Sequence, residues 1–128
     1  MTEDFRLLNS DTAQIIDEFK EIAGDAQIEF RLAKIDPWGN CSNGVTRTQS
    51  HETTNAGEHI KNIAPSWPRA HYLNIWVVNS IQGNAAGYSY YPGTAGEGQD
   101  GILMNHAYVG SIGTGNIRRS RTLTHETG

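Results

Sequence analysis

The segment from Tyr72 to Val78, with the sequence YLNIWVV, is the strongest strand signal in the chain. Side chains that are β-branched or aromatic suit an extended backbone, and successive residues of a strand point to opposite faces. One face would carry Leu73, Ile75 and Val77, and the opposite face would carry Trp76. Because both faces are apolar, we expect a central strand that is covered on both sides. The sequence therefore predicts a layered domain that contains both a sheet and helices.

Weaker patterns predict the remaining elements. Alternating or β-branched residues predict strands over residues 28–32, 45–48, 86–91 and 101–109. The strand over 86–91 runs into Pro92, so we expect it at an edge of the sheet. Helical spacing predicts a helix from Asp11, a capping residue, to Ala23, with Gly24 as its stop. We also expect a helical turn near residues 56–60, a glycine-rich turn over 110–115 and a second helix from about Ser120.

Composition excludes several classes of protein. The 128 residues include 10 Lys and Arg against 14 Asp and Glu, which gives a net charge of −4 at neutral pH. A mildly acidic chain is poorly suited to bind nucleic acid through its charge. No apolar run approaches the roughly 20 residues of a membrane-spanning helix. The segment Met1–Arg6 does not read as a secretion signal, so we expect none within this sequence.

Cys41 is the single cysteine of the sequence. It excludes a disulfide between two of these residues and the zinc modules that use several cysteines. Two interpretations of Cys41 remain. It is a buried or inert free thiol, or it pairs with a cysteine outside the 128 residues.

The most informative candidate for chemistry is the pair His125 and Glu126, in the final segment RTLTHETG. His-Glu begins the motif H-E-x-x-H, in which two imidazoles one helical turn apart bind Zn²⁺ and the glutamate acts on the metal-bound water. The second histidine position would follow Gly128 directly. The alternative is an exposed pair whose carboxylate complements the dipole at a helix start.

A second copy of the same tripeptide shows that the pair is not specific by itself. His51-Glu-Thr53 has Asn55 at the position of the second ligand, and an amide cannot replace imidazole there. The two copies differ in context, since the first lies in a polar connection. The copy at His125 opens a predicted helix after a strand and a turn, where packed structure would hold a ligand.

Several blocks of sequence extend this context over essentially the whole chain. They are Phe5–Thr12, Ile28–Ala33, Gly44–Thr48, Tyr72–Val77, Ala86–Gly93, Asp100–Ile102 and Arg121–Gly128. In their order and spacing these blocks resemble the pappalysin family of metzincin peptidases, including its ulilysin-like bacterial members. The resemblance implies an α/β (α+β) fold, the upper subdomain of a metzincin. This subdomain has a twisted mixed sheet of about five strands with packed helices, and it ends at the start of the active-site helix. Residues 1–128 would be the N-terminal part of a catalytic domain whose C-terminal subdomain lies past Gly128.

The resemblance also implies the site residues. His125 would be the first zinc ligand and Glu126 the general base, while the other two histidine ligands, the Met-turn and the calcium sites of the family would follow Gly128. A peptide or protein substrate would lie along the edge strand formed by Gly87, Tyr88, Ser89, Tyr90 and Tyr91. The alternative for these tyrosines is ordinary half-buried packing in a strand. By the same resemblance the protein is secreted or periplasmic, with a signal and a propeptide before Met1.

We therefore expect a zinc-dependent endopeptidase when the full chain is present, and an inactive polypeptide when only these residues are. The rival hypothesis is a self-contained, non-enzymatic α/β binding domain. In a complete domain, Ile102, Leu103 and Tyr108 should be covered by the chain itself. In one half of a larger domain, an apolar face of the sheet should be open to solvent.

Overall fold

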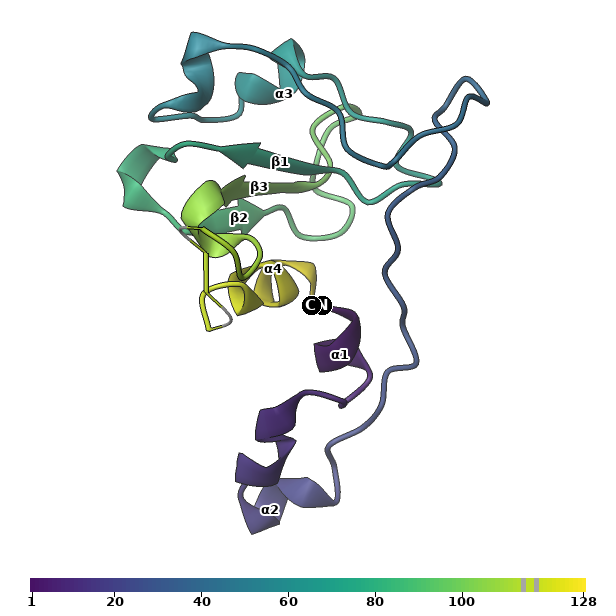
Figure 1. The fold of residues 1–128 in the computed structure, drawn as a ribbon, viewed down its shortest axis with the longest axis vertical. Coiled ribbons are helices and arrows are strands. Elements are labelled where there is room, and N and C mark those ends of the chain that lie inside the picture. Colours follow the sequence, from purple (N-terminus) through teal and green to yellow (C-terminus); the bar gives the residue numbers. More distant parts are fainter. Residues whose placement is uncertain (114, 117) are drawn as a thin grey trace. The chain divides into compact units, whose positions relative to one another are not determined.

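The computed structural model describes residues 1–113, 115, 116 and 118–128 (Figure 1). The α-helices are α1 (Thr2–Phe5), α2 (Asp17–Lys20), α3 (Ile60–Ile63) and α4 (Arg121–Thr127). The strands are β1 (Ile75–Val78), β2 (Gly87–Ser89) and β3 (Ile102–Asn105). Short 3₁₀ helices complete the list at η1 (Ser10–Gln14), η2 (His51–Thr53), η3 (Gln82–Asn84) and η4 (His106–Tyr108). The chain divides into two compact units, Met1–Arg31 and Leu32–Gly128.

The second unit is built on a three-stranded mixed sheet in the order β1-β3-β2. β1 runs parallel to β3, and β2 runs antiparallel to it. The expected α+β class and mixed sheet are confirmed, although the sheet is smaller than the five strands expected. β2 lies at an edge as predicted. β1 also lies at an edge, so the prediction that this strand is central was wrong, and the central strand is β3.

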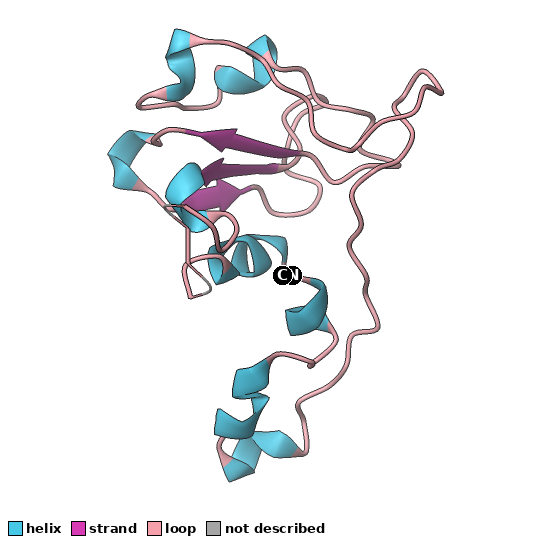
Figure 2. Cartoon of the chain, in the orientation of Figure 1, coloured by secondary structure: helices cyan, strands magenta, loops and turns pink. Residues whose placement is uncertain are grey.

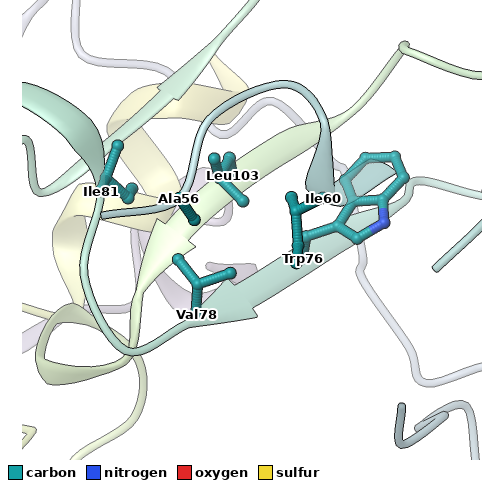
Figure 3. Close-up of a cluster of buried hydrophobic side chains, with 6 residues drawn as sticks. All are labelled: Ala56, Ile60, Trp76, Val78, Ile81 and Leu103. Atoms are coloured by element: carbon teal, nitrogen blue, oxygen red, sulfur yellow. The ribbon is translucent and has the colours of Figure 1, made fainter. Parts of the chain in front are cut away.

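One face of the sheet holds the hydrophobic core (Figure 3). The register aligns Trp76 of β1 and Tyr88 of β2 with Leu103 of β3, so these three side chains share a face. Ile60 of α3 packs on this face, and the Trp76 indole donates a hydrogen bond to the carbonyl of Ala64 at 2.7 Å. The buried cluster is completed by Ala56, Val78 and Ile81.

The opposite face is covered only in part. α4 contacts β2 and β3 there, on the side of the sheet away from α3 (Figure 1). Ile102 and Met104 of β3, which point to this face, are therefore buried, while their neighbours Ile75 and Val77 of β1 remain 38% and 50% exposed. The prediction that both faces of β1 are covered was therefore wrong. Among the described segments, α4 packs on β2 and β3 but not comparably on β1.

Two predicted strands are absent from the described residues. Residues 28–32 and 45–48 are drawn as loop in Figure 2. In the first unit, the backbone of Phe30 is hydrogen-bonded to the hydroxyl of Thr2 in both directions, at 3.0 and 3.2 Å, and its ring meets Phe5 edge-on at 5.2 Å. Alternation predicts an extended backbone, but a strand also needs hydrogen bonds to the backbone of a neighbouring strand. At Phe30 the backbone groups are instead paired with the side chain of Thr2.

The predicted helix from Asp11 to Ala23 was also wrong in its continuity. The structure has η1 and α2 instead, separated by Ile15 and Ile16 in extended conformation. Ile16, Phe19 and Ile22 are exposed in the first unit. Most of the stability of a short helix comes from packing of its apolar face, and a unit of this size provides little surface for that.

The end of the second unit follows the prediction more closely. α4 begins at Arg121, one residue after the expected start. The helical turn expected near residues 56–60 overlaps α3 only at Ile60, where that helix starts. β3 ends at Asn105, whose side chain accepts a hydrogen bond from the amide of Ala107. The predicted turn over residues 110–115 includes position 114, which lies outside the described residues.

Candidate active site

The helix α4 carries both candidate catalytic residues. Side chains and backbone stabilise its last turn, since Thr127 Oγ1 donates to the carbonyl of Leu123 at 2.8 Å and the Gly128 amide to that of Thr124 at 3.2 Å. Carbonyls in the last turn of a helix need such partners because no further helical amide reaches them. His125 and Glu126 therefore lie on regular helix, as the motif requires.

A direct hydrogen bond joins α4 to the edge strand β2. The hydroxyl of Ser89 donates to the carbonyl oxygen of Glu126 at 2.8 Å and lies 3.4 Å from its Oε2 atom. Side chains alternate along a strand, so Ser89 points toward α4 while Tyr88 and Tyr90 point to the other face. The structure thus brings together Glu126, the candidate general base, and Ser89, a candidate substrate-binding residue.

His125 is exposed on the surface of α4, next to Glu126 in sequence. An exposed imidazole on a regular helix fits the role of one zinc ligand. Among the described residues, however, no group of three or more His, Cys, Asp or Glu side chains could hold a metal ion. The described part of the chain therefore provides one fitting ligand and no complete metal site.

The strand β2 presents its backbone at the edge of the sheet. Gly87 allows a close approach to β3, because a Cβ atom there would lie 2.5 Å from Met104 Sδ. Burial, and next the Glu58 carboxylate, raise the pKa of Tyr88, and the same carboxylate raises the pKa of Tyr90. Tyr91 is 85% exposed. Tyr88 is half-buried, as the alternative interpretation of the tyrosines expects. The backbone of β2 nevertheless lies at the edge of the sheet.

The remaining sequence candidates lie apart from this site. The second His-Glu pair lies in η2, where Oε2 of Glu52 lies 3.4 Å from Nε2 of His59. His106 is exposed, and its Nδ1 atom lies 3.0 Å from the carbonyl of Asn79. Cys41 is a free thiol and is exposed, so only the buried form of the free-thiol interpretation was wrong; an inert exposed thiol and a pairing outside these residues both stay open. Within the described ranges, no helix has the length and apolar character that a bilayer span requires.

Sequence reasoning missed one group beside β2. Lys61 of α3 is 2% exposed, and its ammonium lies between the Glu58 carboxylate and the rings of Trp76, Tyr88 and Tyr90. The i,i+3 spacing of Glu58 and Lys61 is the only sequence signal, and it is equally typical of a solvated helix face.

Comparison with solved structures places the chain among known folds. It matches mirolysin in complex with compound 9, with a TM-score of 0.83, 34% identity and coverage of 98% of this chain and 50% of that one. It matches a point mutant of promirolysin from Tannerella forsythia (TM-score 0.83, 32% identity, 98% and 44% coverage). Mature mirolysin of Tannerella forsythia in complex with a cleaved peptide also matches, with a TM-score of 0.79, 34% identity and coverage of 98% of this chain and 50% of that one. The chain thus spans about half the length of these proteins. No family model and no curated protein matches it.

The fold is therefore that of a metzincin, here an α+β unit with a mixed sheet, an antiparallel edge strand and a helix that carries His-Glu. Mirolysin is a pappalysin-family, ulilysin-like metzincin, so the resemblance to this family that the sequence predicts is confirmed.

Proposed function

We propose that these residues form the N-terminal part of the catalytic domain of a zinc-dependent endopeptidase of the pappalysin type. The observation that carries this proposal is the hydrogen bond from Ser89 to Glu126, in a chain with a mirolysin-like fold. This contact joins the helix of the His-Glu pair to an edge strand, and such proximity supports a site in which an extended peptide would lie beside Glu126. The other zinc ligands, the Met-turn and any calcium sites would lie past Gly128.

The chain's own residues would have distinct roles in the reaction. His125 would bind Zn²⁺, which when bound supplies a Lewis acid and lowers the pKa of its water. Glu126 would take a proton from the attacking water and deliver it to the leaving amine. The backbone of residues 87–91 would bind an extended peptide by adding it as a further strand at the free edge of β2. Cys41, being exposed, is available to pair with a cysteine elsewhere in a secreted or periplasmic protein.

The variant Glu126→Gln in the full-length protein tests this proposal. We expect kcat for peptide cleavage to fall by about 10²–10⁴-fold, with a small change in KM, because the amide keeps the shape of the side chain but cannot accept the proton. The control is Glu52→Gln, in the His-Glu pair that lies outside the site. Equal activities of the two variants would refute the role of Glu126.

Zinc content gives a second test. The full-length protein is expected to carry zinc and to lose it in the variant His125→Ala. A polypeptide of residues 1–128 should purify without stoichiometric zinc and cleave no peptide, since a single imidazole binds the metal weakly. Zinc or activity in that polypeptide would mean that a second chain supplies ligands or that His125 is misassigned.

The rival function is a non-enzymatic binding domain, and burial bears on both hypotheses. Ile102 and Leu103 are covered by the chain itself, as that hypothesis expects, but Tyr108 is only half-buried. Ile75 and Val77 leave an apolar face open, as expected for one half of a larger domain. The gene sequence after Gly128 separates the two hypotheses. A histidine as the next residue, with another six residues further on, completes the metzincin motif, and any other residue at the first of these positions favours the binding domain.

A further inference from the structure

The buried lysine Lys61 requires an explanation beyond the fold. Lysine is among the residues least often buried, because its ammonium is strongly hydrated. In this structure the side chain of Lys61 is fully shielded from solvent. Nothing in the roles proposed for His125 and Glu126 uses it, and it lies on the opposite face of the sheet from α4.

The ammonium of Lys61 contacts groups from several segments around the sheet. It donates a hydrogen bond to the carbonyl of Gln99 at 2.8 Å, and it lies 3.2 Å from Oε2 of Glu58, whose carboxylate oxygens are also buried. The distance from Lys61 Nζ to the ring centroid is 5.2 Å for Trp76, 5.7 Å for Tyr88 and 5.0 Å for Tyr90. One cation thus joins β1, β2 and the segment that leads into β3.

β2 has few other contacts to hold it in place. It has only three residues, it lies at an edge, and β3 is its one ladder partner among the described strands. On one face, Ser89 fixes it to α4. On the other face, Tyr88 and Tyr90 lie against Lys61. The distance between the edge strand and the helix of Glu126 therefore depends on a contact on each face.

We propose that Lys61, paired with Glu58, is a positioning residue for substrate binding. Through its contacts with Tyr88 and Tyr90 it holds β2 at the distance from Glu126 at which a peptide can pair with the strand. This inference rests on the proposed function. Lys61 contacts neither substrate nor zinc in this proposal and acts only through the strand. An attraction between an ammonium and aromatic rings is strongest when water is excluded, which is the situation of Lys61.

The experiment uses the full-length protein with the variant Lys61→Met, which keeps the length of the side chain and removes its charge. For peptides long enough to pair along residues 87–91, we expect KM to rise by between about tenfold and a hundredfold, because a displaced β2 loses one or two of its backbone hydrogen bonds to the peptide. The value of kcat should change less than twofold, because Glu126 is untouched. Lys34→Met is the matched control, since Lys34 is exposed in the same unit. Lys61→Arg should restore part of the loss, because a guanidinium also carries the charge and stacks on aromatic rings but is larger than the ammonium it replaces.

Hydrogen exchange of the same proteins separates positioning from general stability. Lys61→Met should accelerate the exchange of the amides of residues 87–91 and leave those of α4 unchanged. Equal acceleration throughout the unit, or a fall in kcat with unchanged KM, would overturn the proposal. If Lys61→Met does not fold, Tyr90→Leu removes one ring at a 39% exposed position without leaving a buried charge, and the same rise in KM is expected. A parental KM in Tyr90→Leu would then overturn the proposal.

The exchange measurement also separates the two proposals. If the full-length protein cleaves no peptide, the proposed function fails, and exchange at residues 87–91 still decides whether Lys61 holds β2. If cleavage is normal in Lys61→Met and the strand exchanges as in the parent, only the inference about Lys61 fails.

Discussion

Replacing Ser89 with alanine should weaken the packing of α4 on β2. The Ser89 hydroxyl donates to the carbonyl of Glu126 at 2.8 Å, and the pair is partly buried. This carbonyl lies in the last turn of α4, where no further helical amide can reach it. The substitution removes one oxygen atom and adds nothing, so the lost hydrogen bond is its main effect.

The expected loss in the free energy of unfolding is about 1 kcal/mol. A hydrogen bond between neutral groups contributes that much on average, and a fully buried carbonyl left without a partner would cost up to about 3 kcal/mol. The site is only partly buried, so water can reach the carbonyl and the lower figure applies. With a urea dependence of about 2 kcal/mol per M for a domain of this size, the midpoint should fall by about 0.5 M.

Urea unfolding followed by tryptophan fluorescence measures this loss, since Trp76 is buried in the core of the same unit. The matched control is Ser111→Ala, at an exposed serine, and its midpoint should stay that of the parent. Ser89→Thr keeps a hydroxyl and should recover part of the loss. If Ser89→Ala shifts the midpoint no more than Ser111→Ala does, the contact between α4 and β2 does not stabilise the unit.

Three further outcomes follow from burial, titration and backbone geometry. Leu103→Ala should lower the free energy of unfolding by about 3–5 kcal/mol through the cavity it leaves, while Val77→Ala, at a half-exposed position, should cost under about 1 kcal/mol, as urea titrations would measure. The raised pKa of Tyr88 means that the folded state holds its proton above the unfolded value near 10. The contribution of Tyr88 to stability should therefore be constant below about pH 9 and be lost as pH rises above that range, so the stability of Tyr88→Phe should fall less steeply at alkaline pH. Gly101→Ala should lower the melting temperature more than Gly98→Ala, because both glycines have positive φ but only at Gly101 would a Cβ atom collide with Asn74 and Trp76.

The parts of the fold that the sequence predicts correctly are those with short-range causes. The four residues of β1 are β-branched or aromatic, and Pro92 shortly after β2 indicates an edge. α4 begins within a residue of its expected start. Each of these patterns acts within a few residues of the element it determines, so no knowledge of distant partners is needed.

The errors arise where a distant partner decides the outcome. The alternation around Phe30 predicts a strand, but its backbone is bound by the hydroxyl of Thr2, which no local pattern indicates. The apolar faces of the strand Ile75–Val78 predict a central position, but the sheet order places β3 there instead. Hydrophobic patterning states that a face should be buried, and it does not state which segment covers it.

The candidate site divides in the same way. The motif itself points to His125 and Glu126, and the resemblance to a family points to residues 87–91. Neither indicates that Ser89 would donate to Glu126, because the contact depends on how α4 lies on the sheet. Lys61 was missed for a similar reason, since its burial results from Tyr88 and Tyr90, which follow it by more than 25 residues.

The alternation of β2 has a consequence for how an endopeptidase of this kind would select its substrates. Ser89 is bound to α4 on one face of the strand, and Tyr88 and Tyr90 are held against Lys61 on the other. Only the backbone of these residues is then available at the edge, and backbone hydrogen bonds are the same for every peptide sequence except proline. The strand would therefore contribute affinity and orientation with little discrimination between side chains. Preference for particular residues must come from pockets formed by other segments, so substitutions at Tyr90 should change KM for all cleavable peptides by similar factors.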